Sequence, residues 1–265
     1  MRFAKAQACG NDFLIVEGEL DQELTRKLCE RHIGLGADGV EFLERTSPLT
    51  GRIRLANADG SIAEISGNGT RCVAAWLAHN TNAAPGDVIT LETDAGPRTC
   101  TIVEANGNTF NIAANMGVPE LRQMQITLAD KTVVYGVHVS TGNPHFVIVV
   151  NDANFRAHSR GWQELGKEIC FHKDFPNHIN VLYVRMISAS EIEIRIFERG
   201  VGPTTSSGTG TCASATAVVA YCGGLSPVTV HAPGGSQQVD WNGPGSEMSL
   251  TGPAEIIAAG EVLLA

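Results

Sequence analysis

One five-residue pattern, Ser-Gly-x-Gly-Thr, occurs twice in this 265-residue chain and constrains its fold more than any other feature. The copies begin at Ser66 and Ser207, 141 residues apart, and each leads into an alanine-rich apolar stretch. Serine is a good helix N-cap and glycine allows a tight turn, so each copy predicts the start of a helix. Capping alone would explain one copy. Two copies in matching contexts indicate an internal duplication.

A duplicated helix start also suggests a binding site. The first turn of a helix has N–H groups without intrahelical partners and a partial positive charge, which suits a carboxylate. Two such starts facing each other would hold one carboxylate and place a serine on either side of the adjacent carbon. That arrangement suits an enzyme that removes a proton from one face and returns one to the other.

Composition narrows the class of protein. The 43% hydrophobic and 18% charged residues are typical of a globular protein. A net charge of −9 argues against binding to nucleic acid. No apolar stretch approaches the roughly 20 residues that span a bilayer, so we expect no membrane association. Seven scattered cysteines without a CxxC pair favour reduced thiols and a cytoplasmic location.

Apolar periodicity divides the chain into two similar halves. Alternation predicts strands throughout both, most clearly at Glu191–Phe197. Helical spacing is found at Asp21–His32 and Trp162–Cys170. A boundary at Met116–Pro119 separates the halves, so we predict an α+β protein with domains at residues 1–117 and 118–251.

Neither a nucleotide nor a metal is expected. Gly34–Gly39 matches G-x-G-x-x-G, but it follows a predicted helix and precedes a strand, the reverse of a dinucleotide-binding unit. His172 and His178 lie on a predicted loop, and the chain has no paired-cysteine or HExxH pattern.

Several polar residues lie at predicted turns. Glu198 and Arg199 follow a strand and precede the second helix start, where Arg could bind a carboxylate and Glu an ammonium group. A surface ion pair would explain them equally well. Asparagine suits turns in any case. Together with Glu198 and Arg199, four asparagines would form a pocket for an amino-acid zwitterion: Asn11, Asn57, Asn143 and Asn180.

These residues belong to longer motifs in which the chain resembles the diaminopimelate epimerases over nearly its whole length. The motifs are ACGNDF at Ala8–Phe13, GADGVEFL at Gly36–Leu43, NADGS at Asn57–Ser61, SGNGTRC at Ser66–Cys72, GNPHFV at Gly142–Val147 and ERGVGPTTSSGTGTCA at Glu198–Ala213. The resemblance implies a cofactor-free epimerase that interconverts LL- and meso-diaminopimelate for lysine and cell-wall synthesis. A homodimer is a further expectation.

The resemblance also implies a fold and a set of site residues. Each half would be a β-barrel-like sheet around a central helix, with the tail at about 252–265 returning to the first half. Ser66 and Ser207 occupy the two catalytic positions, and His145 matches a histidine that supports catalysis. Backbone N–H groups would hold the reacting carboxylate: those of Gly67, Asn68, Gly208 and Thr209. The remaining substrate contacts would come from Asn11, Asn57, Asn143, Asn180, Glu198 and Arg199.

The chain departs from the family at both catalytic positions, where the family has cysteine and this sequence has serine. A thiol has a pKa near 8.5 that falls further at a helix N-terminus, so a thiolate can remove the α-proton while an opposite thiol donates one. A serine hydroxyl is far less acidic, and no sequence neighbour of either serine is an obvious base. Pro203 also replaces a glutamate usual in the family.

Three explanations remain open at this point. Engineered replacement of both cysteines by serine would leave an inert epimerase that could still trap substrate. A divergent isomerase could use native serines and recruit Glu198 and His145 as its acid–base pair. A non-catalytic homologue could simply bind an amino acid. The fold alone does not decide between them.

Overall fold

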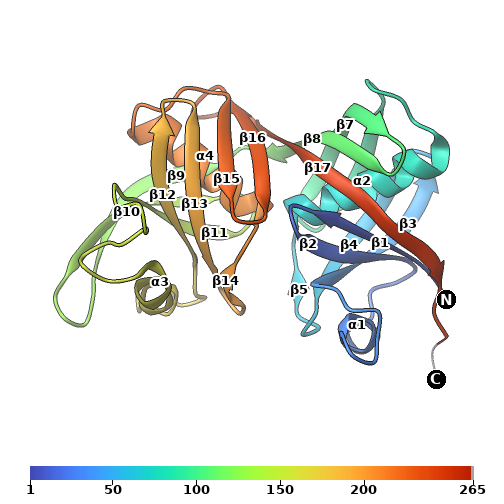
Figure 1. Cartoon of the computed structure of the whole chain (residues 1–265), viewed down its shortest axis with the longest axis horizontal. Coiled ribbons are helices and arrows are strands. Elements are labelled where there is room, and N and C mark those ends of the chain that lie inside the picture. The colour runs from blue at the N-terminus through green and yellow to red at the C-terminus, as the bar shows by residue number, and fades with distance from the viewer. Residues whose placement is uncertain (264–265) are drawn as a thin grey trace. The chain divides into compact units, whose positions relative to one another are not determined.

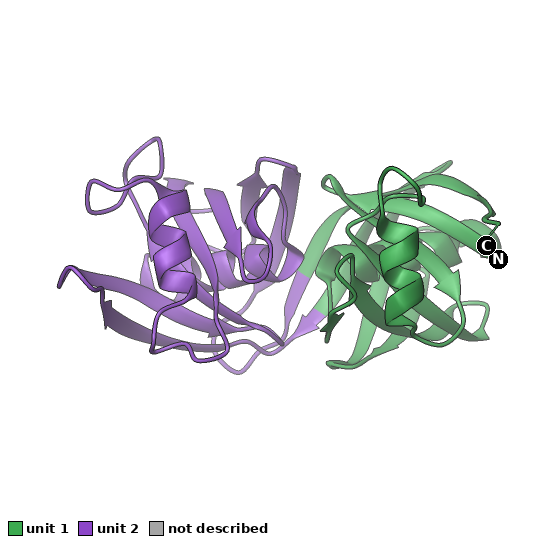
Figure 2. Cartoon of the chain, turned by 90° about the horizontal axis from the view of Figure 1, so that it is seen from below, with its two compact units in different colours: residues 1–115, 250–265 green, residues 116–249 purple. Residues whose placement is uncertain are grey.

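The structure, a computed structural model, describes residues 1–263 as two compact units (Figure 2). The first unit comprises residues 1–115 and the C-terminal segment from Leu250. The second comprises Met116–Ser249. Among the described residues, no helix has the length and apolarity that crossing a membrane requires.

The first unit contains two helices and nine strands, of which β8 and β17 extend a few residues into the second unit (Figure 1). The ninth strand, β17, follows the second unit in the sequence. Its helices are α1 (Gln22–Cys29) and α2 (Gly67–Thr81). Its strands are β1 (Arg2–Ala8), β2 (Asn11–Glu17), β3 (Gly39–Ser47), β4 (Thr50–Asn57), β5 (Ile62–Ala63), β6 (Val88–Thr93), β7 (Gly96–Asn106), β8 (Thr109–Gly117) and β17 (Met248–Glu261).

The strands of the first unit close into a barrel-like sheet around α2. Each strand pairs with the next in the order β17, β1, β2, β3, β4, β6, β7 and β8. Strand β8 also pairs with β17, which closes the circle. Helix α2 contacts β1, β2, β3, β6 and β7, and eleven of its fifteen residues are buried. A helix enclosed on all sides needs small side chains, which explains its alanine content.

The second unit is built from two helices and eight strands. The helices are α3 (Trp162–Cys170) and α4 (Gly208–Tyr221). The strands are β9 (Glu120–Thr127), β10 (Val133–Ser140), β11 (Pro144–Val149), β12 (Asn180–Ser188), β13 (Glu191–Glu198), β14 (Gly202–Thr204), β15 (Val228–Ala232) and β16 (Gly235–Trp241). Helix α4 contacts β10 to β13, β15 and β16.

The two units repeat one plan. In the first, β2 and β3 pair in parallel, β4 follows antiparallel, and β6 joins β4 in parallel. In the second, β11, β12, β13 and β15 pair in the same succession. Helices α1 and α3 occupy matching connections, as do α2 and α4. These findings confirm the predicted fold of two pseudo-symmetric α+β halves, each a barrel-like sheet around a central helix.

Successive side chains of β3 point to opposite faces of the sheet. Val40 and Phe42 pack with residues of α1 in one apolar cluster. Glu41, between them in sequence, therefore points to the other side of the strand, toward α2. The equivalent strand β12 has the same arrangement, with Val181 and Tyr183 in the cluster that includes α3.

Strand β9 lacks the alternation from which strands are predicted in the rest of the chain. The residues of Glu120–Thr127 are mostly exposed, and their apolar side chains do not alternate. Backbone pairing with β10 along its whole length holds this strand in place. Periodicity cannot detect a strand whose position depends on hydrogen bonding rather than on a buried face.

Candidate active site

The two serine positions begin the two central helices. Ser66 is the N-cap of α2, and its Oγ accepts a hydrogen bond from the Gly69 N–H at 3.1 Å. Ser207 caps α4 in the same way, through the Gly210 N–H at 3.3 Å. The first turns are formed by the residues proposed to hold a carboxylate: Gly67 and Asn68 in α2, and Gly208 and Thr209 in α4. Both units therefore contain the positive end of a helix behind a serine.

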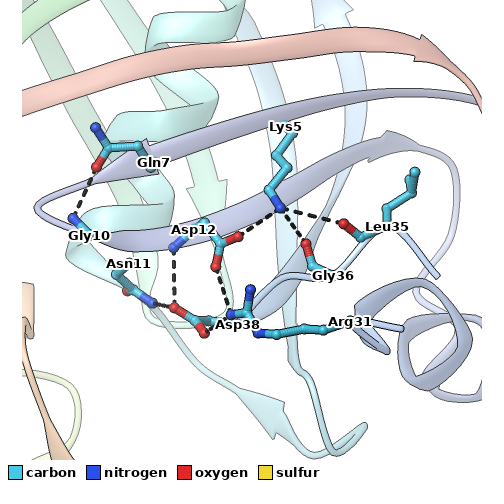
Figure 3. Close-up of polar contacts among 9 residues, drawn as sticks. All are labelled: Lys5, Gln7, Gly10, Asn11, Asp12, Arg31, Leu35, Gly36 and Asp38. Atoms are coloured by element: carbon cyan, nitrogen blue, oxygen red, sulfur yellow. Dashed lines mark hydrogen bonds and ion pairs between the residues drawn. The ribbon is translucent and has the colours of Figure 1, made fainter. Parts of the chain in front are cut away.

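Asn11 lies beside the first helix start. The amide of Asn68 donates to Asn11 Oδ1 at 3.3 Å, and Asn11 in turn donates to Asp38 Oδ2 at 2.7 Å. Figure 3 shows the Asn11 side chain directed at Asp38 on the loop before β3. The carboxylate thus determines which way the Asn11 amide points.

An ion cluster behind Asn11 fixes Asp38 (Figure 3). Arg31 Nη2 contacts Asp38 at 2.8 Å and Asp12 at 3.2 Å, and Lys5 Nζ lies 2.9 Å from Asp12. Burial alone would raise the pKa of Asp12, but hydrogen bonds from Lys5 and Arg31 outweigh it and lower that pKa. Lys5 also donates to the Gly36 carbonyl at 2.6 Å. The glycine-rich loop therefore supports the position of Asn11.

Asn57 ends β4 and is held within its own turn. Its amide donates to Ser61 Oγ at 3.0 Å, and its backbone N–H bonds to the Ser61 carbonyl at 2.8 Å. In the second unit, Asn143 accepts a hydrogen bond from Thr141 Oγ1 at 3.4 Å, just before β11. Both asparagines have the turn geometry that the sequence predicted.

His145, Asn180 and Arg199 form a connected chain in the second unit. Asn180 Nδ2 lies 3.4 Å from His145 Nε2, and Asn180 Oδ1 accepts the Arg199 N–H at 3.0 Å. The Arg199 guanidinium donates to the Asn177 carbonyl at 3.3 Å. Glu198, the last residue of β13, precedes Arg199 and is partly exposed.

Burial lowers the pKa of His145 to about 3, so its ring is neutral near pH 7. A group with so low a pKa is a weak general base at that pH. A neutral ring suits the orientation of Asn180 better than proton transfer. The low pKa of His145 therefore weighs against the hypothesis that Glu198 and His145 form a substitute acid–base pair.

Glu41 on β3 is an ionisable group beside Ser66 that the sequence analysis did not identify. The carboxyl group is buried, and a Cβ added to Gly69 would stand 1.9 Å from its Oε1 atom and 3.2 Å from Ser66 Cβ. A buried carboxyl group therefore lies close to Ser66, although no neighbour in sequence provided an ionisable group. The available signal was a single charge inside the otherwise apolar stretch Gly39–Leu43.

Cys72 and Cys212 lie inside the two helices and have no exposed surface. Burial is the main cause that raises the pKa of Cys72 above its ordinary range. A thiol in this state is an apolar packing group. These cysteines do not replace the missing pair at Ser66 and Ser207.

The fold is shared with solved structures of racemases and epimerases. A probable proline racemase from Agrobacterium radiobacter superposes with a TM-score of 0.77 at 15% identity, covering 100% of this chain and 93% of that one. A hydroxyproline epimerase from Agrobacterium vitis gives a TM-score of 0.74 at 16% identity, covering 99% and 90%. At these identities the likeness shows a shared fold of two repeated units. The match to a family of epimerases defines the chain as an isomerase of the amino-acid racemase and epimerase class.

The sequence comparisons identify the family. A model of the family described as diaminopimelate epimerase matches residues 3–122 and 137–257. The diaminopimelate epimerase of Halothermothrix orenii is 37% identical over 100% of this chain and 98% of its own length. That of Corynebacterium glutamicum is 35% identical, over 98% and 97%. The chain belongs to the diaminopimelate epimerase family.

Glu41 makes the folding stability of the protein depend on pH. Burial raises its pKa from an ordinary value of 4.5 to about 8. Between these values the unfolded chain loses this proton and the folded chain keeps it, so folding stability falls as pH rises. Glu41→Leu should raise the free energy of unfolding, and the gain should grow to the order of a few kcal/mol between about pH 5 and pH 8. Urea unfolding measures it; a gain equal at both pH values would contradict this expectation.

Because Glu41 lies so close to Gly69, we expect the protein to be sensitive to replacement of this glycine. At the matching place in the second unit, a Cβ on Gly210 would stand 3.1 Å from Leu182 Cδ1, a far milder contact than at Gly69. Gly69→Ala should cost about 1–3 kcal/mol more than Gly210→Ala in urea unfolding. Adding Glu41→Ala should recover most of the difference. Equal losses for the two glycines would show that the carboxyl group is not wedged there.

Proposed function

We propose that this chain acts on diaminopimelate by proton transfer at the α-carbon, with Ser66 and Ser207 at the two proton-transfer positions. Membership of the family supports the substrate. The observation that carries the proposal is the repeated helix start, a serine cap followed by a first turn whose N–H groups suit a carboxylate. The role is in lysine and peptidoglycan precursor synthesis, in the cytoplasm and without a cofactor.

Each unit would supply part of the substrate contacts. The reacting carboxylate would bind the N–H groups of Gly67, Asn68, Gly208 and Thr209. The distal amino-acid group would bind Asn57, Asn180 and Arg199, while Asn11, Asn143 and Glu198 complete the polar lining. The hydrogen bonds that fix Asn11 and Asn180 support this assignment, because a fixed amide loses less entropy on binding.

The serines also support an alternative. A divergent isomerase acting on another amino or carboxylic acid, or an amino-acid-binding homologue without catalysis, would have no need of two cysteines. The low pKa of His145 weighs against its use as the base of such an isomerase. Failure to bind diaminopimelate would favour a divergent isomerase of another acid, because the main proposal requires that ligand.

Restoring the thiols tests the reaction. The Ser66→Cys/Ser207→Cys variant should interconvert LL- and meso-diaminopimelate in deuterated water and take up deuterium at the α-carbon at least about 100-fold faster than the parent chain. Mass spectrometry and chiral chromatography follow both processes. Saturable binding without deuterium uptake in either protein would favour a binding homologue. Failure of both proteins to bind diaminopimelate would eliminate the substrate assignment.

Arg199 tests the contact with the distal group. If its guanidinium pairs with a carboxylate, Arg199→Ala should weaken diaminopimelate binding by more than about 1.5 kcal/mol. Isothermal titration calorimetry gives the dissociation constant directly. Arg195→Ala is a suitable control, since Arg195 is engaged with Glu193 on the same strand. An unchanged affinity in Arg199→Ala would refute the assigned role.

A further inference from the structure

Glu41 is a buried carboxyl group without a hydrogen-bond partner among the described residues. Its side chain is 1% exposed, and neither oxygen is hydrogen-bonded. The cross-strand neighbours in register are Ile15 on β2 and Leu55 on β4, both apolar. A polar group in such surroundings costs free energy. Its presence therefore needs a reason other than stability.

The carboxyl group lies against the first turn of α2. Glu41 Oε1 and Ser66 Cβ both lie close to the point that a Cβ on Gly69 would occupy, so no more than the sum of 1.9 Å and 3.2 Å separates them. The same Gly69 donates its N–H to Ser66 Oγ. Gly69 leaves room for the carboxyl group, which stands immediately behind the serine cap.

The second unit shows that the fold does not need this carboxyl group. Gly39 and Asn180 begin the matching strands β3 and β12, which makes Leu182 the equivalent of Glu41. Leu182 Cδ1 occupies the corresponding place beside Gly210 and Ser207. An aliphatic side chain thus fills the position in one copy of the repeat, and a carboxyl group fills it in the other.

We propose that Glu41 is the proton acceptor that acts through Ser66, so that this chain removes an α-proton more readily on the Ser66 side than on the Ser207 side. The inference rests on the proposed function. In the step, the α-proton passes to Ser66 Oγ while the hydroxyl proton of Ser66 passes to Glu41 Oε1. The electron pair of the C–H bond stays on the α-carbon, and the reverse step restores all three groups.

The resting structure has Ser66 Oγ in its capping position, and the transfer requires the hydroxyl to turn toward Glu41. The hydroxyl remains able to donate, because its capping contact uses it only as an acceptor. The positive end of α2 favours the negative charge that develops there. Glu41 does not touch the substrate in this scheme and acts only through the serine.

The surroundings of Glu41 give the step its pH dependence. With a pKa raised by burial to about 8, the carboxyl group can both accept and return a proton near neutral pH. Arg71 and Cys72 are the ionisable groups on the adjoining part of α2, and Arg71 bonds the Gly67 carbonyl and Asn68 Oδ1. The cross-strand neighbours in register, Ile15 on β2 and Leu55 on β4, do not titrate, and Glu17, two positions beyond Ile15 on β2, is exposed and pairs with Arg45.

The experiment compares two stereoisomers in deuterated water. With the carboxylate held in one place, LL- and meso-diaminopimelate present the reacting α-hydrogen to opposite sides. The full-length parent chain should exchange one isomer at least about ten-fold faster than the other, at a rate that rises toward about pH 8. Proton NMR follows the loss of each α-hydrogen. Equal exchange of both isomers would overturn the proposal by requiring a second base.

Variants at Glu41 separate the chemical role from a structural one. Glu41→Gln should slow exchange by about 100-fold and abolish its rise with pH, with diaminopimelate affinity unchanged. Glu41→Leu copies the second unit, should fold, and should lose exchange in the same way. Glu44→Gln, at an exposed position of the same strand, should leave exchange unchanged. Full exchange in Glu41→Gln would overturn the proposal.

The result also separates this inference from the function on which it rests. An active Ser66→Cys/Ser207→Cys variant beside a parent chain that binds diaminopimelate without measurable exchange would uphold the substrate and the two proton-transfer positions and would reject the role of Glu41. Absence of diaminopimelate binding in both proteins would reject the function and the inference together.

Discussion

The rest of the structure depends on the enclosure of a helix N-terminus by a closed sheet. Water is largely excluded from the first turns of α2 and α4, so their backbone dipoles act in surroundings of low polarity. A serine hydroxyl satisfies one N–H of each turn. The alanine-rich helices, the glycines of the first turns and the surrounding strands together enclose that end.

Much of this could be predicted from the sequence, because repetition and alternation are local signals. The twin Ser-Gly-x-Gly-Thr pattern located both helix starts, and the strict alternation of Glu191–Phe197 located β13. Strand β9 was not predicted, because its position depends on pairing with β10. Glu41 was missed for a related reason. Its significance lies in contact with Gly69, twenty-eight positions later, and periodicity shows only that a charge interrupts an apolar strand.

The asymmetry between the two copies is as informative as their likeness. Both keep the helix start, the parallel strand pair and a covering helix, which are the features required for folding. The copies differ at Glu41 and Leu182, and at His145, whose counterpart at the start of the parallel pairing is the apolar Phe13. Glu41 and His145 thus each lie in one copy at a position where the other copy has an apolar residue. In a duplicated fold, each residue of one copy can be compared with the residue at the matching position of the other copy.

The last strand of the chain has a consequence for the order of folding. Strand β17 pairs with β1, and Arg2 lies opposite Glu261. The second unit is one continuous segment, whereas the first also needs β17, which is made after the second unit. During synthesis, Met116–Ser249 can therefore complete its sheet while β1 still presents an open edge. Domains generally fold as units in the order of their synthesis, and here the N-terminal unit must close last.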